Sequence, residues 1–357
     1  MEGLAMPSAA VTISVVLGTH EAGAELEETL ASLVAQRGAP AWECLIVANG
    51  RFEADAALQH RLATDCRFRL LHSEPPGLTE ALRLGCAQAR GRWIARIDVG
   101  DVMEANRLQR QAAGLERYGA CVLCTSSVQI CGPHWEPIWI DRATGPVNTP
   151  VDALQTPASR GLTVDIPHHA SVMFSREAYL LAGGYRRDFY FGQDWDLWYR
   201  LAQQGPFLVL DEVLTTMRLR TQGISSLHRR EQVAIARLSL ACHIARSAGQ
   251  SEAALLEEAR RIRPSHPARK RREIWRSREA EGLYFIAENM RRQGDPRCRH
   301  YFLLALRQGF WRPRLWWRTL QSLSLRHTKA PPSAPTGRMA TSSAAQDLAE
   351  KNSNPVK

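Results

Sequence analysis

The chain has 357 residues, of which 45% are hydrophobic and 7% aromatic, and its formal net charge is +10 at pH 7. This length and composition exclude a short or disordered protein and predict a globular one, with one large domain plus an annex or two domains. No apolar run approaches the ~18–20 residues that span a bilayer. The run Val11–Leu17 is too short for a secretory signal and lacks a basic flank, so we expect a cytoplasmic protein.

The positive charge is concentrated in the last third of the chain. Residues 229–329 contain 23 Lys and Arg against 9 Asp and Glu, whereas residues 1–228 contain 20 against 25. The sequence therefore joins a mildly acidic front to a strongly basic back, and the two parts are expected to have different roles.

The front alternates strand and helix patterns. The expected strands are Val11–Leu17, Cys44–Val47, Phe68–Leu71 and Trp93–Ile97. The expected helices that follow them are Ala24–Gln36, Glu53–Thr64, Gly77–Arg90 and Glu104–Tyr118. This alternation predicts an α/β fold with a mostly parallel sheet covered by helices, in which ligands bind at the carboxyl ends of strands.

Beyond Tyr118 the pattern changes to strands and loops. We expect strands at Cys121–Ile130, Trp135–Ile140 and His169–Phe174, a loop at 144–160, a helix at Asp194–Gln204 and a strand pair at Phe207–Leu219. Helices are expected at 229–247, 251–262, 269–293, 295–308 and 313–326, before a tail rich in Ser, Ala, Pro and Thr. The predicted organisation is a domain over 1–225, a basic helical region over 226–327 and a disordered tail over 328–357.

Polar side chains follow several of the predicted front strands. Thr19 and Glu21 follow the first strand, Asn49 the second, and Asp98 and Asp101 the fourth. Two carboxylates at a strand end suit Mg²⁺ or Mn²⁺ bridging to a diphosphate. The alternative is that Asp98 is a turn residue and Asp101 caps the helix that begins near Met103.

The stretch GQDWDLWYRLAQQG contains a second candidate. Its apolar positions have helical spacing, and Asp194 lies at or near the N-terminus of that helix. An aspartate at this place can be a helix cap, or it can be a general base if it reaches a substrate proton.

Six segments, in order along residues 11–222, resemble the family 2 glycosyltransferases, an inverting family with the GT-A fold. They are VTISVVLGTHEAGAELEETLASLVAQ, LIVANG, GLTEALRLGCAQARGRWIARIDVGD, HHASVMFSREAYLLAGGYR, GQDWDLWYRLAQQG and MRLRTQGISS. The resemblance implies that the chain transfers a sugar from a nucleoside-diphosphate donor with inversion at the anomeric carbon. It does not specify the sugar.

The resemblance also implies roles for single residues. Thr19 and Glu21 would contact the nucleoside, and Asn49 would face the base, where the family usually has an aspartate. Asp98 would be the first acid of the Asp-x-Asp signature, close to the ribose or a metal. Asp194 would be the catalytic base, with Gln193 in place of the glutamate of the family's Glu-Asp pair.

Two departures from the family pattern concern the metal. Gly100 stands where the signature has its second aspartate, and Arg220 stands where the family often has histidine. Both changes remove a metal-ligand type, and the second adds a permanent cation. Either Asp101 replaces the missing ligand and forms a metal site with Asp98, or metal binding is weakened and Arg220 neutralises part of the diphosphate charge.

Other motifs have simpler explanations. Cys121, Cys124, Cys131 and His134 imitate a zinc pattern, but the first two are expected on opposite faces of a strand, and the eight cysteines resemble buried apolar residues of a reducing compartment. His168 and His169 precede a strand and are candidates for the acceptor side, with polar packing as the alternative. Trp195 is a candidate for sugar stacking or for helix packing.

The basic region mixes arginine with tryptophan, as in HPARKRREIWRSR and FWRPRLWWRTLQSLSLR. These segments can be solvated helix faces, a surface for anionic phospholipid that holds the protein at the inner face of the membrane, or a nucleic-acid patch. No nucleic-acid motif accompanies them, so nucleic acid is not an expected partner.

Taken together, these patterns predict an inverting glycosyltransferase that extends a surface or extracellular glycan from a nucleotide sugar, with a glycan or lipid-linked acceptor. The alternative is a non-catalytic sugar-nucleotide or glycan-binding protein, against which the retained Asp194 speaks. A nucleotidyltransferase would need a basic phosphate loop after the first strand, and LGTHEAG has no lysine or arginine.

Overall fold

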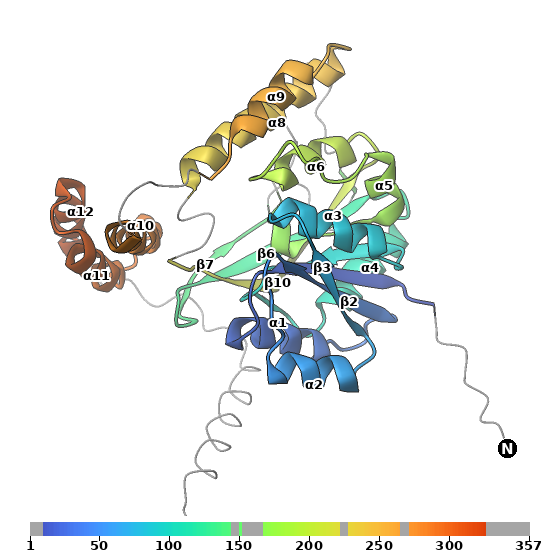
Figure 1. The fold of residues 1–357 in the computed structure, drawn as a ribbon, viewed down its shortest axis with the longest axis horizontal. Helices are drawn as coiled ribbons and strands as arrows, with labels where there is room; N and C mark the ends of the chain where they lie inside the picture. The colour runs from blue at the N-terminus through green and yellow to red at the C-terminus, as the bar shows by residue number, and fades with distance from the viewer. Residues whose placement is uncertain (1–9, 144–149, 152–166, 222–227, 265–270, 326–357) are drawn as a thin grey trace, which may run out of the picture.

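The computed structural model describes residues 10–143, 150–151, 167–221, 228–264 and 271–325 (Figure 1). Its strands are β1 (Ile13–Thr19), β2 (Trp42–Asn49), β3 (Phe68–Ser73), β4 (Trp93–Arg96), β5 (Val102–Met103), β6 (Leu123–Cys131), β7 (Pro137–Asp141), β8 (Pro150–Val151), β9 (Met173–Ser175) and β10 (Phe207–Arg218). They form one sheet with the order β3-β2-β1-β4-β9-β6-β10-β5, and β7 and β8 pair with β6 and β10.

The first half of the sheet is parallel, which decides where its polar side chains meet. β1 pairs in parallel with both β2 and β4, and β2 pairs in parallel with β3. The antiparallel β9 then joins β4 to β6, and β6 pairs in parallel with β10. The carboxyl ends of β1, β2 and β4 therefore lie at the same edge, as the sequence predicts.

Helices cover both faces of the sheet. The helices of the front are α1 (Ala24–Val34), α2 (Ala56–Thr64), α3 (Leu78–Gln88), α4 (Arg107–Arg117), α5 (Arg176–Leu181) and α6 (Gln193–Leu201), with the short 3₁₀ helix η1 (His169–Ser171) before β9. Along β1 the buried side chains alternate, so that Val15 and Leu17 pack with α1 and α4 while Val16 packs with α3 and α6. This produces two apolar layers with the sheet between them (Figure 1).

In its described residues, the basic region has five helices in two groups. They are α8 (Arg229–Ser247), α9 (Ala253–Arg261), α10 (Arg271–Arg292), α11 (Cys298–Gly309) and α12 (Pro313–Leu323). Helices α8 and α9 lie beside α6, whereas α10 to α12 form a separate cluster at one end of the molecule and pack on Ile138 of β7 (Figure 1). In the part of the chain that the structure describes, no helix combines the length and apolarity needed to cross a bilayer.

The predicted α/β fold is confirmed, with two local corrections. The strand pair expected at Phe207–Leu219 is the single long strand β10, which pairs with β6 along its whole length across two register shifts. The strand expected at His169–Phe174 begins instead as the 3₁₀ helix η1, because the Ser171 N–H and hydroxyl both donate to the His168 carbonyl. The predicted boundary at 225 and the predicted tail lie outside the described residues.

A glycine controls how closely the C-terminal helices approach the front. Gly282 of α10 lies against the Thr221 backbone, and a Cβ at this position would be 1.9 Å from the Thr221 carbonyl oxygen.

We expect Gly282→Ala to lower the free energy of unfolding by about 1–3 kcal/mol, because α10 must move away from the front. Urea denaturation followed by circular dichroism measures this. Gly119→Ala is the control, since a Cβ there meets no atom within 4 Å; equal midpoints for the two variants would contradict the close approach.

Candidate active site

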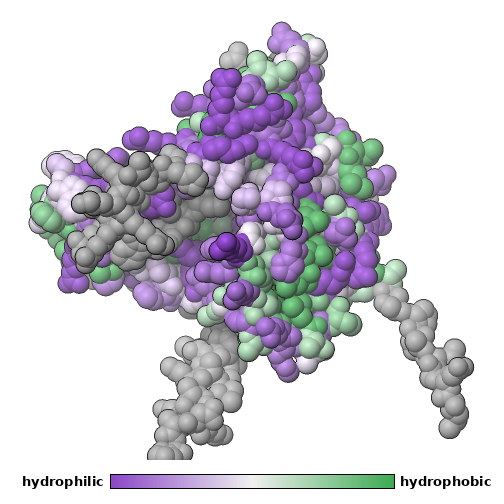
Figure 2. Space-filling view, in the orientation of Figure 1, coloured by the Kyte–Doolittle hydropathy of each residue, from purple (hydrophilic) through white to green (hydrophobic). Residues whose placement is uncertain are grey.

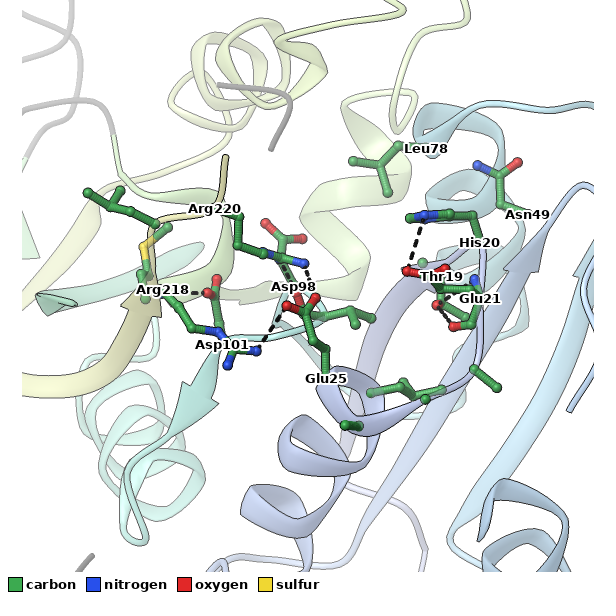
Figure 3. A pocket seen from close by; sticks show the side chains of 18 of the residues that line it. Thr19, His20, Glu21, Glu25, Asn49, Leu78, Asp98, Asp101, Arg218 and Arg220 are labelled. Carbon is green, nitrogen blue, oxygen red and sulfur yellow. Dashed lines mark hydrogen bonds and ion pairs between the residues drawn. The ribbon is translucent and has the colours of Figure 1, made fainter. Parts of the chain in front are cut away.

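A cavity of about 520 Å³ lies at the carboxyl edge of β1, β2 and β4. Six of the residues singled out in the sequence line it, namely Thr19, Glu21, Asn49, Asp98, Asp101 and Arg220. Figure 3 shows them in two groups, with Thr19, Glu21 and Asn49 on one side and the charged Asp98, Asp101 and Arg220 on the other. The parallel pairing of β1, β2 and β4 explains why the first group and Asp98 lie at the same edge. Arg220 follows the end of β10, far along the chain.

The first group is organised by the turn after β1. The Thr19 hydroxyl donates to the Glu21 carbonyl at 2.6 Å, which fixes the loop between β1 and α1. On the same side of the cavity, Asn49 Oδ1 accepts from the Gly77 N–H at 2.8 Å and so anchors the start of α3. An amide oxygen has two lone pairs, so one remains on Asn49 for a further donor.

Asp98 is held by a buried arginine that the sequence interpretation missed. Arg96, on β4, is fully buried, and its Nη2 donates to Asp98 Oδ1 at 2.6 Å. Burial alone would raise the pKa of Asp98, but the charges of Arg96 and Arg220 contribute to a net lowering, so the carboxylate is ionised at neutral pH. An arginine in the apolar run Trp93–Ile97 was the signal that could have revealed this partner.

Asp101 has a different environment from Asp98. Its side chain is 3% exposed, and Oδ1 accepts from the Arg218 backbone N–H at 3.0 Å, which ties the turn to β10. Burial and the neighbouring charge of Asp98 raise the pKa of Asp101 to about 7. The alternative in which Asp101 caps the following helix is wrong, because the cap residue of α4 is Asn106 and Asp101 instead joins the turn to β10.

Gly100 allows an arginine to lie against the turn between the two aspartates. Its φ is +86°, a region that favours glycine, and a Cβ on it would be 3.0 Å from Arg220 Cζ. Arg220 Nη2 donates to the Val99 carbonyl, and Nη1 donates to Glu25 Oε2 at 2.6 Å. The guanidinium therefore lies close to where a side chain at position 100 would begin.

Glu25, in the first turn of α1, connects two arginines at the cavity. Besides Arg220, it pairs with Arg218 Nη2 at 3.1 Å, and Arg218 also pairs with Glu28 at 3.0 Å. Figure 3 marks the contacts of Glu25 with Arg218 and Arg220 by dashed lines. Neither Glu25 nor Arg218 was singled out from the sequence, because both look like ordinary surface charges when read along one element.

Asp194 lies in the first turn of α6, which begins at Gln193 after Gly192. Burial raises the pKa of Asp194 to about 6, and the charge of Asp98 adds to this, while the backbone N–H groups of Asp194 and Trp195 act in the opposite direction. Asp194 is not among the residues that line the cavity. The charge of Asp98 raises the pKa of Asp194 and that of Arg96 lowers it, so the proton affinity of Asp194 responds to the charged groups of the cavity.

The two histidines make the contacts expected of polar packing. His169 Nε2 accepts from Arg96 Nε at 3.3 Å and is 2.7 Å from the Tyr185 hydroxyl. Burial and the charge of Arg96 lower the pKa of His169 to about 3, so the ring is neutral. His168 Nε2 lies 2.8 Å from Asp141 Oδ2. Both histidines therefore have protein partners in this structure.

Comparison with known proteins then identifies the front of the chain. A model of the family "Glycosyl transferase family 2" matches residues 14–180. The front of the chain is therefore similar to this family over residues 14–180. The matched segment contains the first cavity-lining group together with Asp98, Gly100 and Asp101. A search of curated proteins found no significant match.

Solved structures of S. aureus TarS are similar to this chain. The crystal structure of S. aureus TarS residues 1–349 has a TM-score of 0.50 and 13% identity, with 87% of this chain and 89% of that one covered. A longer S. aureus TarS structure has a TM-score of 0.49 and 13% identity, and this chain covers 54% of its length. The complex of S. aureus TarS 1–349 with UDP-GlcNAc has a TM-score of 0.48 and 14% identity, with 87% of this chain and 89% of that one covered. At this identity the likeness to TarS 1–349 shows the fold.

The side chains near the Asp98 turn fit a divalent cation poorly. One oxygen of Asp98 is bonded to a guanidinium, one oxygen of Asp101 accepts a backbone N–H, and position 100 has no side chain. Within the described ranges, no cluster of three or more His, Cys, Asp or Glu side chains could hold a metal ion. The cationic groups that approach this turn are arginines.

The contact between Gly100 and Arg220 can be tested by a double-mutant cycle. We expect Gly100→Ala to lower the free energy of unfolding by about 1–3 kcal/mol, because it combines a positive φ with a contact to the guanidinium. In an Arg220→Ala background the contact disappears and only the backbone cost remains, so the loss should be smaller by at least about 0.5 kcal/mol. Urea denaturation of the four proteins measures both values. Equal losses in the two backgrounds would contradict this packing.

Proposed function

We propose that this chain is an inverting glycosyltransferase that transfers a sugar from a nucleoside-diphosphate donor to a hydroxyl of a glycan or glycolipid. The observation that supports this most directly is the cavity at the carboxyl edge of the family 2 sheet. It brings hydrogen-bonding groups on one side and two aspartates with Arg220 on the other into about 520 Å³. That arrangement suits an elongated ligand with an uncharged base and an anionic diphosphate. We place the reaction on the cytoplasmic side, in surface or extracellular polysaccharide synthesis.

The donor would lie with its base near Asn49 and its diphosphate near Arg220. Thr19, Glu21 and Asn49 offer backbone and side-chain oxygens for the N–H groups of a base and the hydroxyls of a ribose. S. aureus TarS is known in complexes with UDP and with UDP-GlcNAc. A uracil nucleotide is therefore the first donor class to test, alongside those of guanine, thymine and cytosine.

Asp194 would act as the general base. Its carboxylate takes the proton of the acceptor hydroxyl while that oxygen attacks the anomeric carbon. The bond from the anomeric carbon to the diphosphate oxygen breaks on the opposite face, so the configuration inverts. A pKa of about 6 leaves the carboxylate mostly ionised at neutral pH yet more basic than an ordinary aspartate, which favours proton transfer.

We expect Asp194→Asn to lower kcat by about 10²–10⁴, because the amide cannot accept the proton. In the unsubstituted protein, kcat/KM should fall about tenfold per pH unit below about pH 6, as Asp194 becomes protonated, and should level off above it. Release of nucleoside diphosphate from the donor measures both.

The control for Asp194→Asn is Asp211→Asn, which makes the same change at an exposed residue of β10. NMR of the product determines the anomeric configuration. Full activity of Asp194→Asn would contradict its role as base, and a product of retained configuration would contradict inversion.

We further propose that the arginines near the Asp98 turn neutralise much of the negative charge that develops on the leaving diphosphate. Arg220 is one-third exposed, lines the cavity and carries a permanent charge. Fixed cations that point at developing charge are among the largest contributions to catalysis. Glu25 would hold Arg220 in place until the diphosphate arrives and competes for the same guanidinium. In this proposal metal dependence is weak or absent.

Chelation distinguishes this proposal from a conventional metal site. We expect at least half of the activity to survive EDTA, while Arg220→Ala should lower kcat/KM by about 10²–10³. Arg142→Ala, at a mostly exposed arginine of the loop after β7, is the control. Activity that requires Mg²⁺ or Mn²⁺ and is indifferent to Arg220→Ala would overturn the arginine proposal and favour Asp98 and Asp101 as ligands.

A non-catalytic sugar-nucleotide or glycan-binding protein is the second candidate, supported by Gly100 and Gln193 in the places of family acids. Thermal-shift measurements with UDP, GDP, dTDP and CDP separate the possibilities. A ligand at a hundred times its dissociation constant adds about 2.7 kcal/mol to the stability. Binding of one nucleotide without any sugar transfer to water or acceptor would favour this second candidate.

A further inference from the structure

Helix α12 has its large apolar side chains on the outside. Its inward face consists of Leu315, which is 3% exposed, and the small Ser322, which is fully buried. The outward face has Trp316, Trp317, Leu320 and Leu323, which are 52% to 62% exposed. A helix that only packed on the protein would place these residues in the opposite way. The outward face is therefore suited to an apolar environment outside the protein.

The apolar side chains continue onto α11 and the turn between the two helices. We define the aromatic patch by seven exposed residues, namely Leu303, Phe310, Trp311, Trp316, Trp317, Leu320 and Leu323. They are seven of the twelve large hydrophobic residues that are exposed in the described part of the chain. Green hydrophobic surface at the left-hand edge of Figure 2 coincides with the place of α11 and α12 in Figure 1. Exposed apolar residues that gather at one end of a protein mark an interaction surface, whereas apolar residues scattered singly over a surface are normal.

The charges around the aromatic patch are mainly positive, although Glu281 and Glu288 of α10 pair with Arg312 and Arg318 at 3.1 and 3.7 Å. Residues 296–325 include six arginines and no aspartate or glutamate. Arg307 and Arg314 are exposed beside the patch, and the Arg314 guanidinium lies 5.3 Å from the Tyr284 ring. Trp316 donates its indole N–H to the Phe310 carbonyl, which fixes the ring at the turn. An apolar face bordered by cations complements an anionic surface with an apolar interior.

One helix separates this surface from the cavity. Phe285 of α10 lines the cavity, while Ile286 and Met290 of the same helix belong to the apolar cluster that includes Leu315 of α12. Whatever the aromatic patch contacts is therefore held about one helix away from the cavity. A lipid-linked acceptor would gain most from such a position.

We propose that the aromatic patch docks on an anionic phospholipid membrane. The tryptophan and leucine side chains enter the boundary between headgroups and acyl chains, and Arg307 and Arg314 contact lipid phosphates. The protein lies on the membrane surface and does not cross it. This proposal concerns the C-terminal helices and does not depend on the donor chemistry of the cavity.

The test is flotation of the full chain with vesicles of phosphatidylcholine alone or with 30% phosphatidylglycerol added. We expect the protein to bind the anionic vesicles and to bind vesicles without the anionic lipid at least about tenfold more weakly, because a few arginines contribute to the affinity. We expect 0.5 M NaCl to reverse the binding, because salt screens these charges. Trp316→Ser with Trp317→Ser should weaken binding at least about tenfold. The matched control is Leu180→Ser with Leu181→Ser, two adjacent leucines of α5 that are 51% and 69% exposed.

A second pair of variants isolates the charge. Arg314→Gln should weaken binding about fivefold. Arg117→Gln should not weaken it, although the Arg117 guanidinium also lies 5.3 Å from a tyrosine ring, that of Tyr118. Circular dichroism melting of every variant confirms that loss of binding is not loss of folding.

Three results would overturn the proposal. The first is equal binding by the tryptophan variant and by its leucine control. The second is a concentration-dependent dimer in light scattering that the tryptophan substitutions abolish, since a second copy would then cover the patch. The third is salt-sensitive binding to RNA or DNA with no binding to anionic vesicles. Nucleotide-induced melting shifts should be unchanged in the tryptophan variant, so failure here is separable from failure of the glycosyltransferase proposal.

Discussion

The site depends on one buried cation, the guanidinium of Arg96. It is fully buried between β1 and η1, where it donates to the Val16 and Ile97 carbonyls, to Asp98 and to His169. A buried charge is costly unless it is paired and its donors are satisfied. These contacts meet that requirement, and in doing so they fix the direction of Asp98 and the neutral state of His169. The electrostatics of the cavity follow from them, because the aspartate is kept ionised without an external cation.

The turn after β4 illustrates how a charged site is assembled from distant parts. Thr29 of α1 accepts the Gly100 N–H and donates to the Asp101 carbonyl, while Arg218 and Arg220 reach the turn from β10. As a result, the pKa of Asp98 is lowered from its ordinary value and that of Asp101 is raised, although the two residues are only three positions apart. The difference is caused by what surrounds each carboxylate, since one faces a guanidinium and the other lies in a buried position beside the first negative charge.

The C-terminal helices support the site from two directions. Asp196, two residues after Asp194 on α6, is fully buried between Arg186 and Arg200, and Arg186 also pairs with Glu252 at the start of α9. On the other side, α10 contributes Phe285 to the cavity. The helix that carries the proposed base and the wall of the proposed donor site are therefore both joined to the basic region. This arrangement gives the basic region a structural role at the site in addition to any surface that it offers.

The alternation of strands and helices, the edge at which Thr19, Asn49 and Asp98 meet, and the C-terminal helices could be predicted from the sequence, because each follows from local periodicity or from the geometry of parallel strands. The sequence also singled out Gly100 and Arg220, but only as separate departures from a pattern. The folded chain was needed to show that they touch, that Asp101 is bonded to β10, and that α12 has its tryptophans outside. The first two outcomes depend on residues more than a hundred positions apart that pack together. The third depends on how α12 packs against α10 and α11, and burial sets each pKa. Neither the packing nor the burial is encoded in the spacing of residues along one element.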